Sequence, residues 1–188
     1  MDYHDFLNTY HPISRKDYEL IANSLTLCTA KRNELIAAEG TITRELYFVY
    51  AGTQISCYNH DGTERVMSFH YPQSLMGLPD SFYSQQPTRY YIRSLTESKF
   101  GAITLRRLEE LYDKSQAIER LFRKMTEVKF CGLVTRHTEF HTCTIEERFK
   151  NFVARSPRLL QLVPHKYIAS YLNIDATNFS KLYNSIRI

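Results

Sequence analysis

The spacing of the apolar residues changes once along the chain, near Leu105, and this change limits the folds open to it. Before that point, short apolar runs are broken by turn residues, which is typical of strands in a sandwich or barrel. After it, apolar residues recur at helical spacing. A chain of 188 residues can bury a substantial core, so we expect a strand-rich part followed by helices.

The first part carries six apolar runs that end at turn residues. We predict strands over Glu34–Ala38, Glu45–Ala51, Gln54–Asn59, Glu64–Tyr71, Tyr90–Glu97 and Lys99–Thr104. Asp61-Gly62, between the third and fourth runs, supplies the positive φ angles that a tight hairpin needs. Ahead of the strands, Ser14 is placed to cap a helix that reaches Ser24. Short strands joined by turns favour a sandwich or roll over a parallel sheet.

The second part begins with a short helix, Leu105–Lys114, and a long one from about residue 116 to 140. Apolar residues of the long helix follow the 3-4-3-4 spacing of a coiled-coil seam. The predicted seam residues are Ile118, Leu121, Met125, Val128 and Gly132. Phe122, Phe130 and Leu133 widen the apolar surface beyond this seam. We predict that a second copy of the chain packs on the seam, although one broad core face would give the same pattern.

Several classes of protein are excluded by the sequence. No apolar run approaches 18 residues, and the N-terminus lacks the apolar segment of a secretion signal, so we predict no membrane contact. Four scattered cysteines without a CxxC pair are typical of a reducing cytoplasm. No serine-hydrolase, P-loop or zinc-protease motif occurs. We therefore expect a cytoplasmic protein that is not an enzyme.

One pair of histidines has the spacing of metal ligands. His137 and His141 stand one helical turn apart, and Cys143 follows them. The sequence offers no fourth ligand, and the pair falls where the long helix should end. Two solvated histidines are the better interpretation, so no metal is predicted.

The net charge of +4 is concentrated at one end of the chain. Residues 1–143 carry 17 basic and 17 acidic side chains, whereas Thr144–Ile188 carry seven basic and three acidic ones. A local basic surplus is expected of a domain that binds a polyanion. A solvated basic face without a partner would have the same composition, so charge alone leaves both interpretations open.

Three helices are predicted within this basic segment. The capping box Thr144–Glu147 opens the first, which runs to about Arg155. The second covers His165–Leu172 and the third Ala176–Ile186. The last two are joined by only three residues, which is the geometry that docks a second helix into the DNA major groove.

The residues between these two helices suit a tight turn. Asn173 can take the left-handed conformation that ends a helix, and Asp175 can cap the next one. Ile174 is expected to fill the core under the turn, and the small Ala169 lets the two helices approach closely.

The last helix separates its side chains by polarity. Phe179, Leu182 and Ile186 lie on the predicted buried side, and the other face has hydroxyl, amide and ammonium groups without an acid. Such groups bind base edges or phosphates. The predicted DNA-binding residues are Lys166, Ala176, Thr177, Asn178, Ser180, Lys181 and Asn184. Helical pairs without a DNA function also exist, so this pattern predicts DNA binding only together with the basic surplus of the segment.

A strand-rich roll, a long helix and a basic helix-turn-helix together resemble the CRP/FNR family of transcription regulators. Leu46–Gly52 is similar to the family's "lyfvlsG" strand and turn, and Glu39-Gly40 to an earlier turn. Phe69–Gly77 is similar to the approach to its phosphate-binding cassette, and Pro164–Ile174 to the "PQKYLASYLGI" start of its DNA-reading motif. The resemblance implies a jelly-roll domain of cyclic-nucleotide-binding type, a homodimer and binding to double-stranded DNA. RNA polymerase and an unidentified small-molecule effector are further candidate partners.

The cassette departs from the pattern of members that bind cyclic nucleotides. Those members have Glu after the cassette Gly, and later Arg followed by Ser or Thr. With Gly77 aligned on that Gly, Leu78 stands at the Glu position and Thr88 at the Arg position. Leu cannot accept a hydrogen bond from a ribose, and Thr cannot neutralise a phosphate. Arg89 could recover one of these contacts if the loop shifted by one residue, and bulky Tyr90 follows it.

We therefore predict a degenerate ligand pocket that does not bind cyclic AMP or cyclic GMP. Its residues are Gly77, Leu78, Thr88, Arg89 and Tyr90. No four-cysteine spacing for an iron–sulfur centre is present, so no cofactor is predicted.

The predicted fold is α+β, with a β-roll sensor domain at 1–115, a dimerisation helix at 116–141 and a helix-turn-helix domain at 142–188. Because the sequence stops soon after the last helix, we expect a truncated winged-helix arrangement with any wing around Arg158–Val163. The predicted function is a dimeric DNA-binding transcription regulator whose pocket senses another ligand or none. The alternative is a dimeric small-molecule-binding module that has lost DNA regulation.

Overall fold

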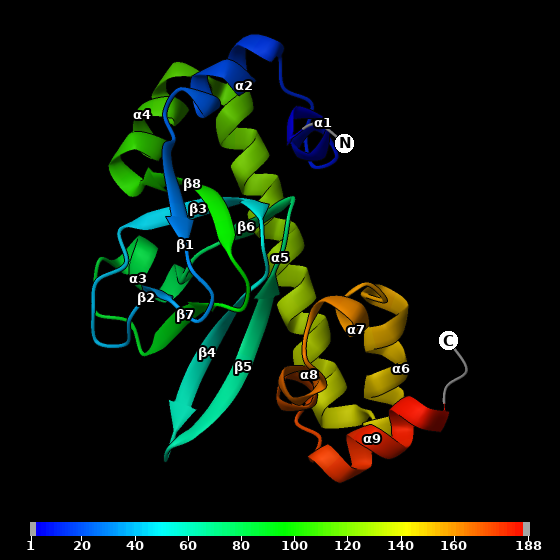
Figure 1. Ribbon diagram of the computed structural model, residues 1–188. Coiled ribbons are helices and arrows are strands. Elements are labelled where there is room, and N and C mark those ends of the chain that lie inside the picture. Colours follow the sequence, from blue (N-terminus) through cyan, green and yellow to red (C-terminus); the bar gives the residue numbers. More distant parts are fainter. Residues whose placement is uncertain (1–2, 186–188) are drawn as a thin grey trace.

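The computed structural model describes residues 3–185 and places two four-stranded sheets face to face (Figure 1). The strands are β1 (Thr26–Ala30), β2 (Leu35–Ala37), β3 (Glu45–Ala51), β4 (Gln54–His60), β5 (Thr63–His70), β6 (Ser74–Met76), β7 (Tyr90–Ser94) and β8 (Ser98–Thr104). One sheet has the order β1-β8-β3-β6 and the other β2-β7-β4-β5, with antiparallel pairing throughout. The predicted strand-rich roll is confirmed.

Alternation along β3 divides the apolar residues between two cores, because successive side chains of a strand point to opposite faces. Tyr47 and Val49 are buried between the sheets with Ile92 and Phe100. Phe48 is buried on the other face, against the helices. Both faces of β3, which lies inside the first sheet, are therefore covered by packed side chains.

The turn between β4 and β5 forms as the sequence predicts. Asp61 and Gly62 have φ angles of 49° and 76°, the two positive values that match a hairpin's twist. Gly52, between β3 and β4, has a φ of 86°, and an added Cβ would lie 2.5 Å from the carbonyl oxygen of Glu97. The positive φ angle and this close contact each exclude a side chain at position 52.

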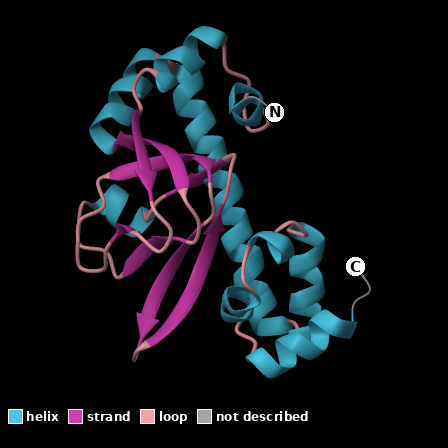
Figure 2. Ribbon diagram, viewed as in Figure 1, coloured by secondary structure: helices cyan, strands magenta, loops and turns pink. Residues whose placement is uncertain are grey.

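Helices cover the outer face of the first sheet and continue beyond it (Figure 2). They are α1 (Tyr3–Asn8), α2 (Arg15–Ala22), α3 (Pro79–Ser84), α4 (Leu105–Lys114), α5 (Gln116–Thr142), α6 (Ile145–Arg155), α7 (Leu159–Leu162), α8 (His165–Leu172) and α9 (Ala176–Ser185). The predicted Ser14 cap and Thr144 capping box are both present. No helix of residues 3–185 is both long and apolar enough to cross a bilayer.

The first half of α5 belongs to the chain's own core, which corrects part of the predicted seam. Ile118, Leu121 and Met125 are at most 2% exposed and pack with α1, α2, α4 and β3. They have no surface left for a second copy, so the seam prediction is wrong for these three. Val128 and Gly132, further along the helix, are exposed. Helical spacing identified the apolar stripe but could not say which part of it the roll would cover.

The C-terminal helices α6–α9 lie beside the lower half of α5 and against the second sheet (Figure 1). Phe149, Phe152 and Phe179 share one core with Ile55 and Val66 of the sheet. The expected wing at Arg158–Val163 is wrong, because this segment forms α7. Leu159, Leu160 and Val163 turn into the helical core there, so the segment has no side free to act as a strand.

Candidate functional site

The α8–α9 pair has the turn that its sequence predicts. Asn173 ends α8 with φ 52° and ψ 51°, and its amide donates to the carbonyl oxygens of Ala169 and Ser170. Ile174 is buried under the turn, and its amide donates to the Ala169 carbonyl oxygen at 2.9 Å. Asp175 then accepts from the Asn178 amide at 2.9 Å, which caps α9. This hydrogen bond is the main cause that lowers the pKa of the Asp175 carboxyl.

All seven predicted DNA-binding residues lie on the surface of this pair. Lys166 is exposed at the start of α8, with its Nζ 4.8 Å from the centre of the Tyr167 ring. The exposed residues of α9 include Ala176, Thr177, Asn178, Ser180, Lys181 and Asn184. Phe179 is buried and Leu182 half-buried on the opposite side, while Ile186 lies outside the described residues. The α9 helix thus presents an acid-free polar face to solvent.

Two of these polar residues are already engaged within the pair. The Asn178 Nδ2 donates to Asp175 Oδ2, and the Ser180 hydroxyl donates to the Ala176 carbonyl oxygen at 2.9 Å. Thr177, Lys181 and Asn184 have no hydrogen bond from their side chains to another described residue.

A contact that sequence analysis missed fastens α8 to the roll. The Ser170 hydroxyl accepts from the Val66 amide at 3.0 Å and donates to the Glu64 carbonyl oxygen at 3.2 Å. The backbone of β5 is therefore hydrogen-bonded to α8 through this one side chain. Residues about a hundred positions apart meet here, and no local spacing in the sequence predicts that.

Arg136 of α5 makes a second connection between the same elements. Its guanidinium donates to the carbonyl oxygens of Met67 in β5 and Tyr171 in α8, and lies 3.7 Å from the centre of the Tyr171 ring. Burial lowers the pKa of Arg136. A buried guanidinium held by two carbonyls and a ring fixes the mutual placement of α5, β5 and α8.

A third connection is built around Glu64 at the start of β5. Arg93 of β7 forms an ion pair with Glu64, and Tyr91 donates a hydrogen bond to the same carboxylate. The Arg93 guanidinium also lies 5.9 Å from the centre of the Tyr167 ring in α8. Strands β5 and β7 therefore contact α8 through polar groups as well as through the shared core.

The loop of the predicted ligand pocket is closed by its own residues. Leu78 follows Gly77, is 3% exposed and packs between the sheets with Tyr47 and Phe100. Thr88 is also buried, and its hydroxyl donates to Asp80 Oδ2 at 2.9 Å. The two positions where the family pattern needs a carboxylate and a guanidinium thus hold a core residue and a satisfied hydroxyl.

Arg89 and Tyr90 extend the same loop toward β4. Arg89 is exposed, and its Nη2 donates to the Tyr58 hydroxyl at 3.0 Å with the guanidinium 5.5 Å from that ring's centre. Tyr90 packs against Tyr58, with ring centres 5.7 Å apart. In this arrangement Arg89 is held by an aromatic side chain on the surface.

The interior of the roll also holds a buried polar cluster. His70 Nε2 is 2.8 Å from the Ser56 hydroxyl and 3.1 Å from that of Ser68. Burial, aided by the positive charge of Lys129, lowers the pKa of His70 to about 3. The imidazole is therefore neutral at physiological pH.

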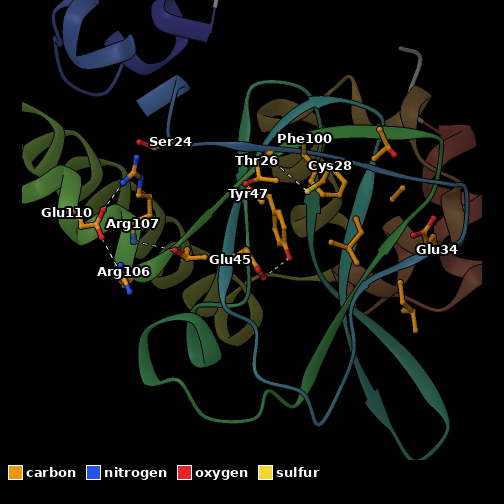
Figure 3. Close-up of a pocket in the computed structure, with 16 residues that line it drawn as sticks. Ser24, Thr26, Cys28, Glu34, Glu45, Tyr47, Phe100, Arg106, Arg107 and Glu110 are labelled. Carbon is orange, nitrogen blue, oxygen red and sulfur yellow. Dashed lines mark hydrogen bonds and ion pairs between the residues drawn. The ribbon is translucent and has the colours of Figure 1, made fainter. Parts of the chain in front are cut away.

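The open end of the roll contains a cavity of about 670 Å³ (Figure 3). Cys28, Glu45, Tyr47 and Phe100 line it from the strands, and Arg106, Arg107 and Glu110 line it from α4 (Figure 3). Glu110 is paired with both arginines. Burial, reinforced by the charge of Glu45, raises the pKa of the Cys28 thiol, so this thiol is protonated.

The histidine pair on α5 is not part of a larger cluster. The rings of His137 and His141 lie 4.5 Å apart, centre to centre, on the exposed end of the helix. Within residues 3–185, no three His, Cys, Asp or Glu side chains gather as metal ligands would.

Comparison by sequence matches residues 27–115 to the cyclic nucleotide-binding domain family. No curated protein matches the chain. This family match covers the strands from β2 to β8, most of β1 and all of α4.

Comparison by structure extends the likeness over almost the whole chain. FixK2 from Bradyrhizobium japonicum has a TM-score of 0.74 and 19% identity, covering 85% of this chain and 83% of that one. The regulator CLP from Xanthomonas campestris, described as c-di-GMP responsive, has a TM-score of 0.67 and 12% identity, covering 91% of this chain and 90% of that one. The catabolite activator protein of Thermus thermophilus has a TM-score of 0.62 and 15% identity, covering 96% of this chain and 85% of that one. The chain therefore has the cyclic nucleotide-binding fold followed by a long helix, an arrangement that it shares with these three structures.

Proposed function

We propose that this chain is a DNA-binding transcription regulator of the CRP/FNR type, in which α8 and α9 form the helix-turn-helix. The observation that carries the proposal is the exposed, acid-free polar face of α9 behind a capped three-residue turn. The basic surplus of Thr144–Ile188 supports it, because phosphate contacts supply most non-specific DNA affinity. Thr177 and Asn178, in the first turn of α9, would face the bases.

Lys181 lies one turn further along α9 and would contact a phosphate. An ammonium is a point charge without the planar fork that makes Arg a bidentate partner of guanine. A phosphate contact weakens binding to all sequences alike and contributes about 0.9 to the slope of log affinity against log salt. A bidentate base contact would instead discriminate one base pair by about 1–3 kcal/mol.

The test is fluorescence anisotropy with a selected duplex and a scrambled one across a salt series. Lys181→Ala should weaken both complexes equally and lower the salt slope by about 0.9. Lys150→Ala is the matched control: it removes one exposed lysine from α6, where Lys150 pairs with Glu146. A loss confined to the selected duplex would assign a base contact to Lys181. If the wild-type protein binds neither duplex, the proposed function is wrong.

The protein would act as a homodimer through the exposed second half of α5. Val128 is 56% exposed there, and an added Cβ at exposed Gly132 would meet nothing within 4 Å of its own chain. Glycine weakens a helix by about 1 kcal/mol relative to alanine, so its place here suits close approach by a second helix. Paired half-sites about 10–10.5 base pairs apart are then expected.

Light scattering coupled to size exclusion tests the dimer. Val128→Glu should give a monomer, because a carboxylate would be desolvated against the second copy. Phe130→Glu is the control, since Phe130 is also exposed, at 65%, but lies about 200° further round the helix. A wild-type protein that is monomeric at tens of micromolar would contradict the dimer.

The effector of this regulator would not be a cyclic nucleotide, because Leu78 and Thr88 close the loop between β6 and β7. The cavity at the open end of the roll supports the alternative function, a small-molecule-binding module without DNA regulation. The anisotropy experiment separates the two, since the alternative predicts no binding to either duplex.

A further inference from the structure

A second cavity, of about 190 Å³, lies outside the roll between α3 and the middle of α5. Leu46 and Leu75 of the first sheet line it, as do Phe82 and Tyr83 of α3. Its α5 residues recur every three or four positions and so form one stripe along the helix: Phe122, Met125, Thr126, Lys129, Phe130 and Leu133. Most of the lining is aromatic or aliphatic.

Lys129 is the one charged side chain among these lining residues. The residue lies on the exposed stretch of α5, but its Nζ turns toward the roll and donates to the Leu75 carbonyl oxygen at 2.9 Å. No carboxylate of residues 3–185 lies within ion-pair distance of this ammonium. Its neighbour His70 is neutral and adds no second positive charge beside it. Burial lowers the pKa of Lys129 to about 8.

Lys129 is an exposed residue, but its Nζ lies against the apolar lining with no carboxylate partner, and an ammonium so placed gains from pairing with an anion. The single carbonyl leaves two of its three hydrogens for another acceptor. An anionic group placed beside Nζ would complete the pairing, and the apolar lining would take the rest of the same molecule.

This stripe is separate from the flank proposed for the dimer. At 100° per residue, Val128 and Phe130 lie on opposite sides of α5, while Phe130 and Leu133 lie on the same side. Phe130 and Leu133 are 65% and 63% exposed at the rim of the cavity, and Tyr83 of α3 is exposed opposite them. A second copy on the Val128 flank would leave this rim open.

We propose that the α3–α5 cavity binds a small apolar carboxylate, with the carboxylate on Lys129 Nζ and the hydrocarbon among the aromatic side chains. The volume suits a molecule of one ring or a short chain, since a cavity of about 150 Å³ accommodates benzene. The site does not depend on DNA binding, so either proposal can fail while the other stands.

Isothermal titration with two matched pairs tests the recognition: benzoate against benzamide, and octanoate against octanamide. Each carboxylate should bind at least about tenfold more tightly than its neutral amide, the gain of a charge-assisted hydrogen bond. Lys129→Met, which keeps the apolar stem, should abolish this preference. Lys124→Met is the matched control, because Lys124 is on the same helix but paired with Glu127 outside the cavity.

The position of binding can be read from methyl-labelled methionine by NMR. Met125 lines the cavity, whereas Met67 is exposed on β5 and lies outside it. Octanoate should shift the Met125 methyl resonance and leave that of Met67 in place.

If Lys129→Met does not fold, Leu133→Glu takes its place, because Leu133 is exposed at the rim. Its new carboxylate should weaken octanoate more than octanamide. Equal affinity for acid and amide in the wild type, a shift of Met67 in place of Met125, or no binding at millimolar concentration would each overturn the proposal.

Discussion

The α8–α9 pair and the loop from Gly77 to Arg89 differ in where their polar groups find partners. In α9, Thr177, Lys181 and Asn184 face solvent with their side-chain donors and acceptors open. In the loop, Thr88 is bonded to Asp80 and Arg89 to Tyr58, and Leu78 belongs to the core. A polar group that is bonded within its own chain has to give up that hydrogen bond before it can bind a ligand. By that criterion the polar face of α9 is open and the loop from Gly77 to Arg89 is closed.

The largest change in the free energy of unfolding should come from a substitution on the buried face of α9. Phe179→Ala removes a ring that packs 5.3 Å, centre to centre, from Phe149, and should lower the free energy of unfolding by about 3–5 kcal/mol. Asn184→Ala, on the exposed face, should change it by less than about 0.5 kcal/mol. Urea denaturation measures both. If both variants lost the same free energy of unfolding, Phe179 would not lie on the buried side of α9.

A carboxylate introduced at position 78 should show that the loop is closed. Leu78→Glu should destabilise the protein by about 3 kcal/mol or more, because the carboxylate would be buried without a partner, and should not create cyclic AMP binding. Leu27→Glu is the control on exposed β1, where Leu27 is 80% exposed. Thermal unfolding and isothermal titration test both parts. Micromolar cyclic AMP binding to the wild type or the variant would show that the loop is not closed.

The roll should also respond to pH through His70. Its pKa is about 3 when folded against 6.5 for the ordinary group, so the unfolded chain binds more protons between these values. Stability therefore falls as the pH drops below about 6.5, by about 2 kcal/mol between pH 7.5 and 5. His70→Gln, which does not titrate, should remove this part of the slope in urea titrations. An unchanged slope would mean that His70 is charged in the fold.

The smallest effect is expected at Arg89. Arg89→Ala removes an exposed contact with Tyr58 and should cost less than about 1 kcal/mol. Thermal unfolding with and without cyclic AMP should give the same small difference. A nucleotide-dependent difference would assign Arg89 to a phosphate.

Features that depend on a few adjacent residues could be predicted from the sequence. Asp61-Gly62, the Thr144–Glu147 capping box and Asn173 each fix their own backbone, so the hairpin and the α8–α9 turn were predictable. Features that depend on distant partners were not. The Ser170 contact with β5 joins residues far apart in sequence, and Met125 could face either the roll or a second copy.

Short elements were missed for a related reason. Strand β6 and helices α1, α3 and α7 are too short for their spacing to stand out, and tertiary packing decides them. Strand β1 was missed too, although it is as long as the predicted β7. Lys129 could not be singled out either, because its lack of a counter-ion appears only once α3, β6 and α5 are assembled.

The most direct test of the account is DNA binding by the full chain with and without saturating cyclic AMP, measured by anisotropy on a selected duplex. The proposed function predicts that the wild-type protein binds, that Lys181→Glu abolishes binding, and that cyclic AMP leaves the wild-type dissociation constant unchanged. Binding that appears only with cyclic AMP, or that survives Lys181→Glu unchanged, would contradict it.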